Sequence, residues 1–190
     1  MLHKQQIMRI TSIIFLICIL AFSAFAQQGL RTGVLAPSFS AVGMDGNTHD
    51  LNNYRGKVVV VTFWSSKCQI CHEEIPKLNR LAARYRNQNV VFLAFTMENE
   101  EKVSSYVKNV PFDFTIIPNS FGVVLQYADR DRSGNLDMGF PAYFIVNQAG
   151  EIQLKTGGWD KTPNLDSQIS KLLNSARSTN LAALTSSTSK

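Results

Sequence analysis

The chain has 190 residues, with 19 lysines and arginines against 14 aspartates and glutamates, and a formal net charge of +5. Two of the positive charges, Lys4 and Arg9, lie in a predicted signal peptide, so the remainder would carry 5 − 2 = +3. This weakly basic balance, without a basic stripe, argues against a nucleic-acid partner. Removal of 26 residues would leave 190 − 26 = 164, which suits one domain with a hydrophobic core.

Residues 1–26 have the layout of a secretory signal peptide. Two basic residues precede an apolar run over 10–22, and Ala24-Phe25-Ala26 places small residues at a cleavage site. The run is short for a membrane span of about 20 residues, so we expect cleavage and export, with an uncleaved membrane anchor as the alternative. After it we expect an extended lead-in over 27–35, one domain over 36–176, and a disordered Ser- and Thr-rich tail over 177–190.

The predicted elements alternate between strands and helices. One hairpin turns over Asp45-Gly46-Asn47 and a second over Gln148-Ala149-Gly150. We expect strands over 36–39, 48–51, 57–63, 90–96, 112–117, 142–147 and 151–156, and helices over 68 to about 87, 99–109, 120–128 and 165–176. This order predicts an α/β fold, in which a mixed central sheet is flanked by helices on both faces.

The segment from Lys57 to Pro76 combines a strand, two cysteines and a helix. A run of β-branched and aromatic residues leads to Cys68 and Cys71, and a helical pattern follows. The N-terminus of a helix presents unpaired backbone N–H groups and a partial positive charge, which stabilise a thiolate. We therefore expect Cys68 to be the exposed nucleophile, with a pKa below that of an ordinary cysteine. The more buried Cys71 would resolve the mixed disulfide.

The cysteine count favours redox chemistry over a structural role. Cys18 would leave with the signal peptide, so only Cys68 and Cys71 would remain. A bond between residues three positions apart closes almost no loop and therefore adds little stability. A purely structural disulfide is therefore a poor explanation of this pair.

Together these motifs resemble the exported thioredoxin-like oxidoreductases of the TlpA and ResA type, related to the AhpC/TSA superfamily. The resemblance covers about residues 34–175. Its motifs are Ala36-Pro37-x-Phe39, the strand from Gly56 to Trp64, the pattern W-x-x-x-C-x-x-C-x-x-E-x-P from Trp64 to Pro76, a proline at 141, and the hairpin from Phe144 to Ile152. It implies a thioredoxin fold with an N-terminal β-hairpin, a redox disulfide Cys68–Cys71, and no metal or organic cofactor.

The resemblance also implies roles for residues around the cysteines. Pro141 would follow a cis peptide bond and lie against the cysteines. Glu74 would lie three residues after Cys71 on one helix face and accept its proton, unless it is an ordinary solvated helix residue. The candidates for substrate contact are Trp64, Gln69, Ile70 and Phe140.

The chain departs from the family pattern at three places. Thr62 stands where cytoplasmic thioredoxins carry a buried acid, Phe140 is bulkier than the usual residue before the cis-proline, and 129–139 looks like an insertion.

The resemblance further implies partners and a location. We expect protein thiols and disulfides as substrates and an upstream membrane or periplasmic redox donor. The location would be periplasmic or otherwise extracytoplasmic, with membrane attachment only if the signal segment stays uncleaved. The family is mostly reductive, so we expect reduction of substrate disulfides.

Motifs in this chain also leave three other interpretations open. Cys68-x-x-Cys71-His72 also spells the attachment motif of c-type haem, although the preceding strand and Trp64 favour the thioredoxin context. A thiol peroxidase is the second alternative, but no proline precedes Ser65, and a second cysteine at +3 favours exchange. Third, residues 129–137 imitate a calcium loop, but position 12 of that loop is Phe140 rather than a bidentate glutamate.

Overall fold

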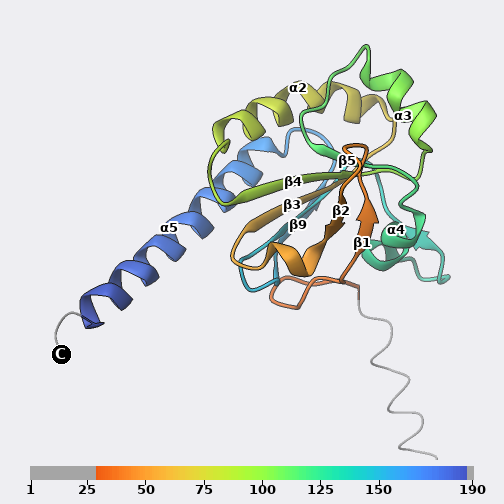
Figure 1. Ribbon diagram of the computed structural model, residues 1–190. Helices are drawn as coiled ribbons and strands as arrows, with labels where there is room; N and C mark the ends of the chain where they lie inside the picture. Colours follow the sequence, from red (N-terminus) through yellow and green to blue (C-terminus); the bar gives the residue numbers. More distant parts are fainter. Residues whose placement is uncertain (1–28, 188–190) are drawn as a thin grey trace, which may run out of the picture.

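The computed structural model describes residues 29–187, so the predicted signal segment, 1–26, lies outside the described part of the chain (Figure 1). Its elements in chain order are β1 Ser40–Val42, β2 Thr48–Asp50, the 3-10 helix η2 Leu51–Tyr54, β3 Val58–Phe63, α2 Gln69–Arg84, β4 Val90–Phe95, α3 Glu100–Val107, β5 Thr115–Ile117, α4 Phe121–Tyr127, β6 Asp129–Arg130, β7 Leu136–Asp137, β8 Ala142–Val146, β9 Ile152–Gly157 and α5 Thr162–Ser187. None of the helices between residues 29 and 187 has both the length and the apolar character that crossing a bilayer requires.

A five-stranded sheet forms the centre of the molecule, in the order β5-β4-β3-β8-β9. β3, β4 and β5 run parallel, while β8 is antiparallel to β3 and β9 is antiparallel to β8. All six residues of β3 are buried, because this strand has neighbours on both sides and helices over both faces. The predicted mixed sheet is thus confirmed, and β1 and β2 form the predicted N-terminal hairpin.

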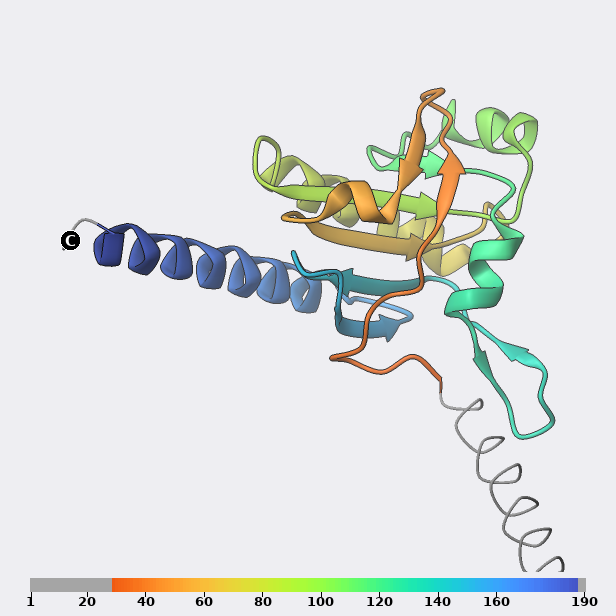
Figure 2. The ribbon, with the colours of Figure 1, turned by 60° about the horizontal axis from the view of Figure 1, so that its bottom comes forward.

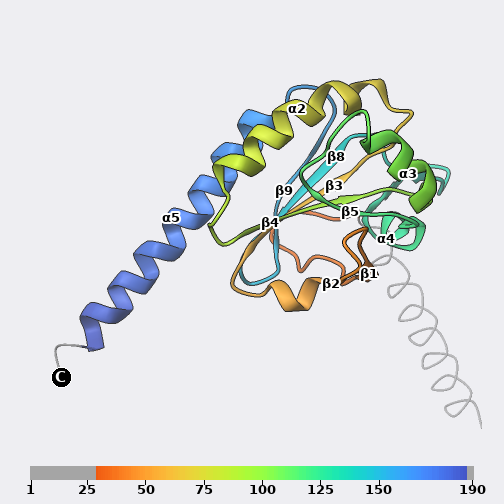
Figure 3. The same ribbon diagram turned by 45° about the horizontal axis from the view of Figure 1, so that its top comes forward.

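The two faces of the sheet carry separate hydrophobic cores. Along β3, Val58 and Val60 point to a core that includes residues of α2, α3 and α5. Val59, Val61 and Phe63 point to the other core, which is formed with α4 and the N-terminal segment. Figure 3 shows α2 and α5 side by side over the first face. We call these the α2 face and the α4 face.

Several boundaries differ from the prediction. α2 ends at Arg84 rather than near Asn87, which adopts a left-handed conformation with φ 66°. β1 begins at Ser40, because the preceding residues lie along β9: the Gly33 N–H donates to the Ile152 carbonyl at 2.7 Å, and the Ala36 N–H donates to the Gly150 carbonyl at 2.9 Å.

The C-terminal helix is longer than predicted. α5 continues to Ser187, through most of the stretch 177–190 that we expected to be a disordered tail. α5 begins at Thr162, and the sequence from Asn164 onward contains neither glycine nor proline, so no residue that breaks helices interrupts it.

The segment that looked like an insertion forms a small hairpin of its own. β6 and β7 pair antiparallel, with Asp129 opposite Asp137, and the hairpin projects beside α4 (Figure 2). It leads directly into Phe140 and Pro141 and so brings the chain back to the sheet at β8.

Candidate active site

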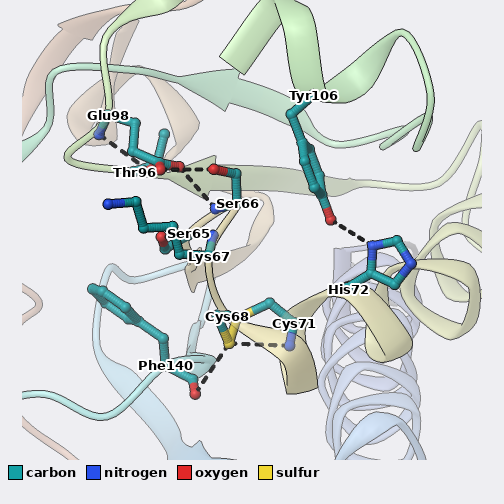
Figure 4. The surroundings of a disulfide bond; sticks show 10 residues. All are labelled: Ser65, Ser66, Lys67, Cys68, Cys71, His72, Thr96, Glu98, Tyr106 and Phe140. Atoms are coloured by element: carbon teal, nitrogen blue, oxygen red, sulfur yellow. Dashed lines mark hydrogen bonds between the residues drawn. A yellow bond between two sulfur atoms is a disulfide. The ribbon is translucent and has the colours of Figure 1, made fainter. Parts of the chain in front are cut away.

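Cys68 lies in the connection between β3 and α2, immediately before the first residue of α2. It is the N-cap residue of α2, with extended backbone angles (φ −89°, ψ 109°). Its Sγ accepts a hydrogen bond from the backbone N–H of Cys71 at 3.1 Å, which is the cap that serine or aspartate usually supplies (Figure 4). A sulfur in this place is stabilised as a thiolate by the helix N-terminus.

The two cysteines form a disulfide and differ in exposure. Their Cα atoms are 5.2 Å apart. Cys68 is partly exposed, whereas Cys71 is 2% exposed and belongs to the core under α2. The predicted arrangement, an accessible first sulfur and a buried second one, is confirmed.

The peptide bond between Phe140 and Pro141 lies beside the first cysteine. The peptide bond between them is cis, as predicted. The carbonyl oxygen of Phe140 lies 3.5 Å from Cys68 Sγ, and its half-buried ring packs at the boundary of both cores. The N–H of Gly158 donates to the Pro141 carbonyl at 2.9 Å. A Cβ on Gly157 would lie 2.9 Å from that same carbonyl oxygen, so this close approach requires a glycine.

Glu74 is fully buried on the face of α2 that carries Cys71. Its Oε1 lies 2.8 Å from the Lys77 ammonium, and its Oε2 has no hydrogen-bond partner among the described residues. The solvated-residue alternative is therefore wrong about its position. Tyr143 in β8 is also buried with an unpartnered hydroxyl. Burial, and then the charge of Glu74, raise the pKa of this tyrosine.

The structure corrects the prediction that Trp64 contacts substrate. Its side chain is 1% exposed and packs against Tyr106 and Phe112, with ring centroids 5.5 Å away in both cases. The alternation of β3 explains this, because Trp64 follows Val58, Val60 and Thr62 onto the α2 face. Trp64 is therefore a core residue.

The other candidates for substrate contact lie at the surface. Gln69 is exposed and donates to Glu73 at 2.9 Å, and Ile70, between the cysteines, is 38% exposed. Both follow Cys68 directly in the chain, and the Phe140 carbonyl oxygen lies 3.5 Å from the sulfur of Cys68.

Glu98 is a site residue that sequence reasoning missed. Its carboxylate accepts hydrogen bonds from the backbone N–H of Ser66 at 2.8 Å and from the Ser66 hydroxyl at 2.7 Å (Figure 4). It also pairs with the Lys102 ammonium at 2.6 Å. Burial raises the pKa of Glu98, but the hydrogen bonds from Lys102 and Ser66 lower it by more, so the net shift is downward. The sequence signal that could have identified Glu98 is its position shortly after β4. Because β4 is the parallel neighbour of β3, both strands end at the same edge of the sheet, where Cys68 also lies.

The residues of the haem-like motif and of the calcium-like loop make other contacts in the structure. His72 is exposed and its Nδ1 lies 3.0 Å from the Tyr106 hydroxyl, while the haem motif's cysteines are joined to each other. In the calcium-like loop, the Asp131 carboxylate accepts hydrogen bonds from Ser133 and Asn135 of the same loop. Within residues 29–187, no group of three or more His, Cys, Asp or Glu side chains is arranged to hold a metal ion.

Comparisons with known proteins agree with this geometry. The AhpC/TSA family model matches residues 32–155. The thiol-disulfide oxidoreductase ResA of Geobacillus thermodenitrificans is 30% identical over 160 residues, which cover 80% of this chain and 88% of the relative. The ResA of Geobacillus kaustophilus is 28% identical over 168 residues, or 84% of this chain and 93% of the relative.

Solved structures show the same fold. A thiol:disulfide interchange protein of the thioredoxin family from Chlorobium tepidum has a TM-score of 0.64 and 21% identity over 77% of this chain and 99% of that chain. The exposed lipoprotein thioredoxin Etrx1 of Streptococcus pneumoniae has a TM-score of 0.59 and 19% identity over 72% of this chain and 100% of that chain. The fold is thus thioredoxin-like, as predicted. The chain belongs to the AhpC/TSA family and, within it, to the thiol–disulfide oxidoreductases of the ResA type.

Proposed function

We propose that this protein reduces disulfides of client proteins outside the cytoplasm, with Cys68 as the attacking sulfur and Cys71 as the resolving one. The observation that carries this assignment is the contrast between the two sulfurs. Cys68 is partly exposed and caps α2, whereas Cys71 lies behind it at 2% exposure, on the helix face of the buried Glu74.

The first step forms a mixed disulfide. The Cys68 thiolate attacks one sulfur of the client disulfide, a bond forms between them, and the client's other sulfur leaves as a thiolate that takes a proton from solvent. The Cys71 N–H, which donates to Cys68 Sγ at 3.1 Å, and the positive end of α2 stabilise the attacking thiolate. Clients approach past Gln69, Ile70 and Phe140.

The second step releases the client. Cys71 transfers its proton to the Glu74 carboxylate, and the resulting thiolate attacks Cys68 Sγ. The Cys68–Cys71 disulfide forms and the client's sulfur leaves as a thiolate, so two electrons have passed from the dithiol to the client. A dithiol donor upstream must then reduce the pair before another cycle.

Single-cysteine variants test the order of attack. With an insulin disulfide as client, Cys71→Ser should accumulate a mixed disulfide at Cys68, visible as an adduct by mass spectrometry, and Cys68→Ser should form none. Alkylation of the reduced protein should label Cys68 first, with a pH midpoint below about 8.5. Faster labelling of Cys71, or a midpoint at or above that value, contradicts the assignment. Equilibration against glutathione measures the reduction potential and therefore the direction.

The proposed location rests on residues 1–26, and the pneumococcal protein of similar fold is described as an exposed lipoprotein. Fractionation of cells that produce the full chain should place the protein outside the cytoplasm, and its mass should correspond to cleavage before Gln27. A protein of full-length mass in the membrane fraction would support the anchored alternative instead.

A further inference from the structure

We propose that Lys77 is a positioning residue for the exchange reaction. It holds one oxygen of Glu74 and thereby leaves the other free for the proton of Cys71. This inference rests on the proposed role of Glu74 as the acceptor of that proton.

The first observation is the asymmetry of the Glu74 carboxylate. Oε1 lies 2.8 Å from the Lys77 ammonium, while Oε2 is buried with no hydrogen-bond partner among the described residues. A buried carboxylate oxygen without a partner is costly, and such groups are tolerated where chemistry uses them. By binding Oε1, Lys77 fixes which oxygen remains available as a proton acceptor.

The second observation is the placement of Lys77 between Glu74 and solvent. The side chain of Glu74 is 0% exposed and that of Lys77 is 28% exposed, so the ammonium covers the carboxylate on its outer side. A buried carboxylate needs a counter-charge, and a cation in direct contact supplies it. Hydrogen bonds to Glu74 and then to Asp160 raise the pKa of Lys77, so the ammonium stays charged throughout the neutral range.

The third observation is that a loop beside the active site holds Lys77 in place. Asp160 Oδ1 lies 3.1 Å from the ammonium, and the centre of the Trp159 ring lies 4.5 Å from it. The same loop begins at Gly158, whose N–H donates to the carbonyl of Pro141. Contacts therefore run from the Phe140–Pro141 turn, through this loop and Lys77, to the buried acid.

The charged and titratable groups around Glu74 come from three elements. Cys71 and Lys77 lie on its own helix, Tyr143 faces it from β8, and Asp160 reaches it through Lys77 from the loop after β9. Among them, Lys77 is the cation in direct contact with the carboxylate. Its removal should change the proton transfer that accompanies resolution more than it changes the attack by Cys68.

The test separates attack from resolution. Attack is the rate at which Cys71→Ser protein forms a mixed disulfide with a model peptide disulfide, and resolution is the rate at which protein with both cysteines releases that peptide, each measured from pH 5 to 9. Lys77→Met should slow resolution about tenfold near neutral pH and displace its pH midpoint, with attack changed by less than about twofold. Lys77→Arg should recover most of the rate. Asp160→Asn, which removes the negative charge of the outer partner of Lys77, should have a smaller effect.

Two controls decide whether the role is specific. Arg80→Met removes an exposed positive charge one turn further along α2 and should leave both rates unchanged. In the double variant Lys77→Met/Glu74→Gln the buried charge is gone, so it should fold even if Lys77→Met does not, and it should resolve no more slowly than Glu74→Gln alone.

Three outcomes overturn the inference. One is an unchanged pH profile of resolution in Lys77→Met together with reduced stability, which means a purely structural ion pair. Another is an equal loss of attack and resolution, and the third is a further loss in the double variant relative to Glu74→Gln. By contrast, if Glu74→Gln itself resolves at the parental rate, the proposed role of Glu74 fails first, and that result is distinguishable from failure of Lys77 alone.

Discussion

The α2 face and the α4 face of the sheet differ in whether their buried polar side chains have hydrogen-bond partners. Among residues 29–187, the buried side-chain atoms without a hydrogen-bond partner all belong to residues of the α2 face or the start of α5: Thr62, Trp64, Glu74, Tyr143 and Thr162. On the α4 face, the fully buried Tyr127 donates its hydroxyl proton to the carbonyl of Pro37 at 2.8 Å.

We interpret the α4 face as structural and the α2 face as the one that takes part in the exchange reaction. Both faces pack aromatic rings against one another, as in Phe63 with Phe95 at 5.6 Å between centroids on the α4 face and Trp64 with Phe112 at 5.5 Å on the α2 face, so the two faces differ in their buried polar groups and not in aromatic packing. An unsatisfied buried polar group costs about 1–3 kcal/mol. The α2 face, whose core includes Cys71, bears several such groups, and we expect proton transfer on this face. The predictions below test this division.

The largest expected effect is at Glu74. Glu74→Gln should slow resolution of the mixed disulfide about 10- to 100-fold, because an amide cannot take up the Cys71 proton. The fold should persist, since the amide is nearly isosteric and carries no buried charge. Reduction of an insulin disulfide by excess dithiol measures the effect.

Glu73→Gln is the matched control for this variant. Glu73 is exposed on the next position of α2 and accepts a hydrogen bond from Gln69, so its neutralisation should leave turnover within about twofold of the parent. Equal rates for the two variants would mean that burial of Glu74 serves packing and not exchange.

The two buried tyrosines provide a direct comparison of stability. Tyr127→Phe should lower the free energy of unfolding by about 1–3 kcal/mol, because the Pro37 carbonyl loses its donor. Tyr143→Phe should be close to neutral or slightly stabilising, because its hydroxyl has no partner to lose. Urea unfolding of both variants measures the difference, and a loss at Tyr143 as large as that at Tyr127 would contradict the division of the two faces.

The sequence predicted the parts of this protein that depend on local pattern. The apolar run before Cys68 gave the buried central strand, and the Cys-x-x-Cys spacing placed one sulfur at the N-cap and the other a turn inside. It could not give the exposure of Trp64, because an aromatic residue at a strand end is equally compatible with a groove or a core. The alternation of β3 decides for the core only once the helices over each face are known.

Contacts between distant segments were likewise beyond the sequence. Lys77 and Asp160 are 83 positions apart, and Ser66 and Glu98 are 32 apart, so no periodicity joins them. The sheet order brings these segments together. The tail was misjudged because its serines and threonines suggested disorder, whereas the absence of glycine and proline allowed α5 to continue.

The smallest expected effect lies at the edge of the sheet, where Glu98 fixes the loop before Cys68. Glu98→Gln should lose the charge-assisted part of the hydrogen bonds from Ser66 and Lys102, at a cost of about 1 kcal/mol at neutral pH, and should change Cys68 alkylation only a few-fold. Because folding lowers the pKa of Glu98, its ionised form contributes stability above the unfolded-state pKa of about 4.5, and this contribution is lost as the pH falls through the folded value.

The stability difference between the parent and Glu98→Gln should therefore shrink as the pH is lowered below about 4.5, since the glutamine variant has no such proton to bind. Urea unfolding of the parent and of Glu98→Gln at pH 7 and at pH 3 measures this stability difference at each pH. Glu100 is exposed in the first turn of α3, two positions after Glu98, and Glu100→Gln should show no matching change in alkylation. A difference at Glu98 that stays constant with pH would mean that the Ser66 contacts do not depend on the charge. The loop before Cys68 would then be held by packing, as the α4 face is, rather than by an ionised group.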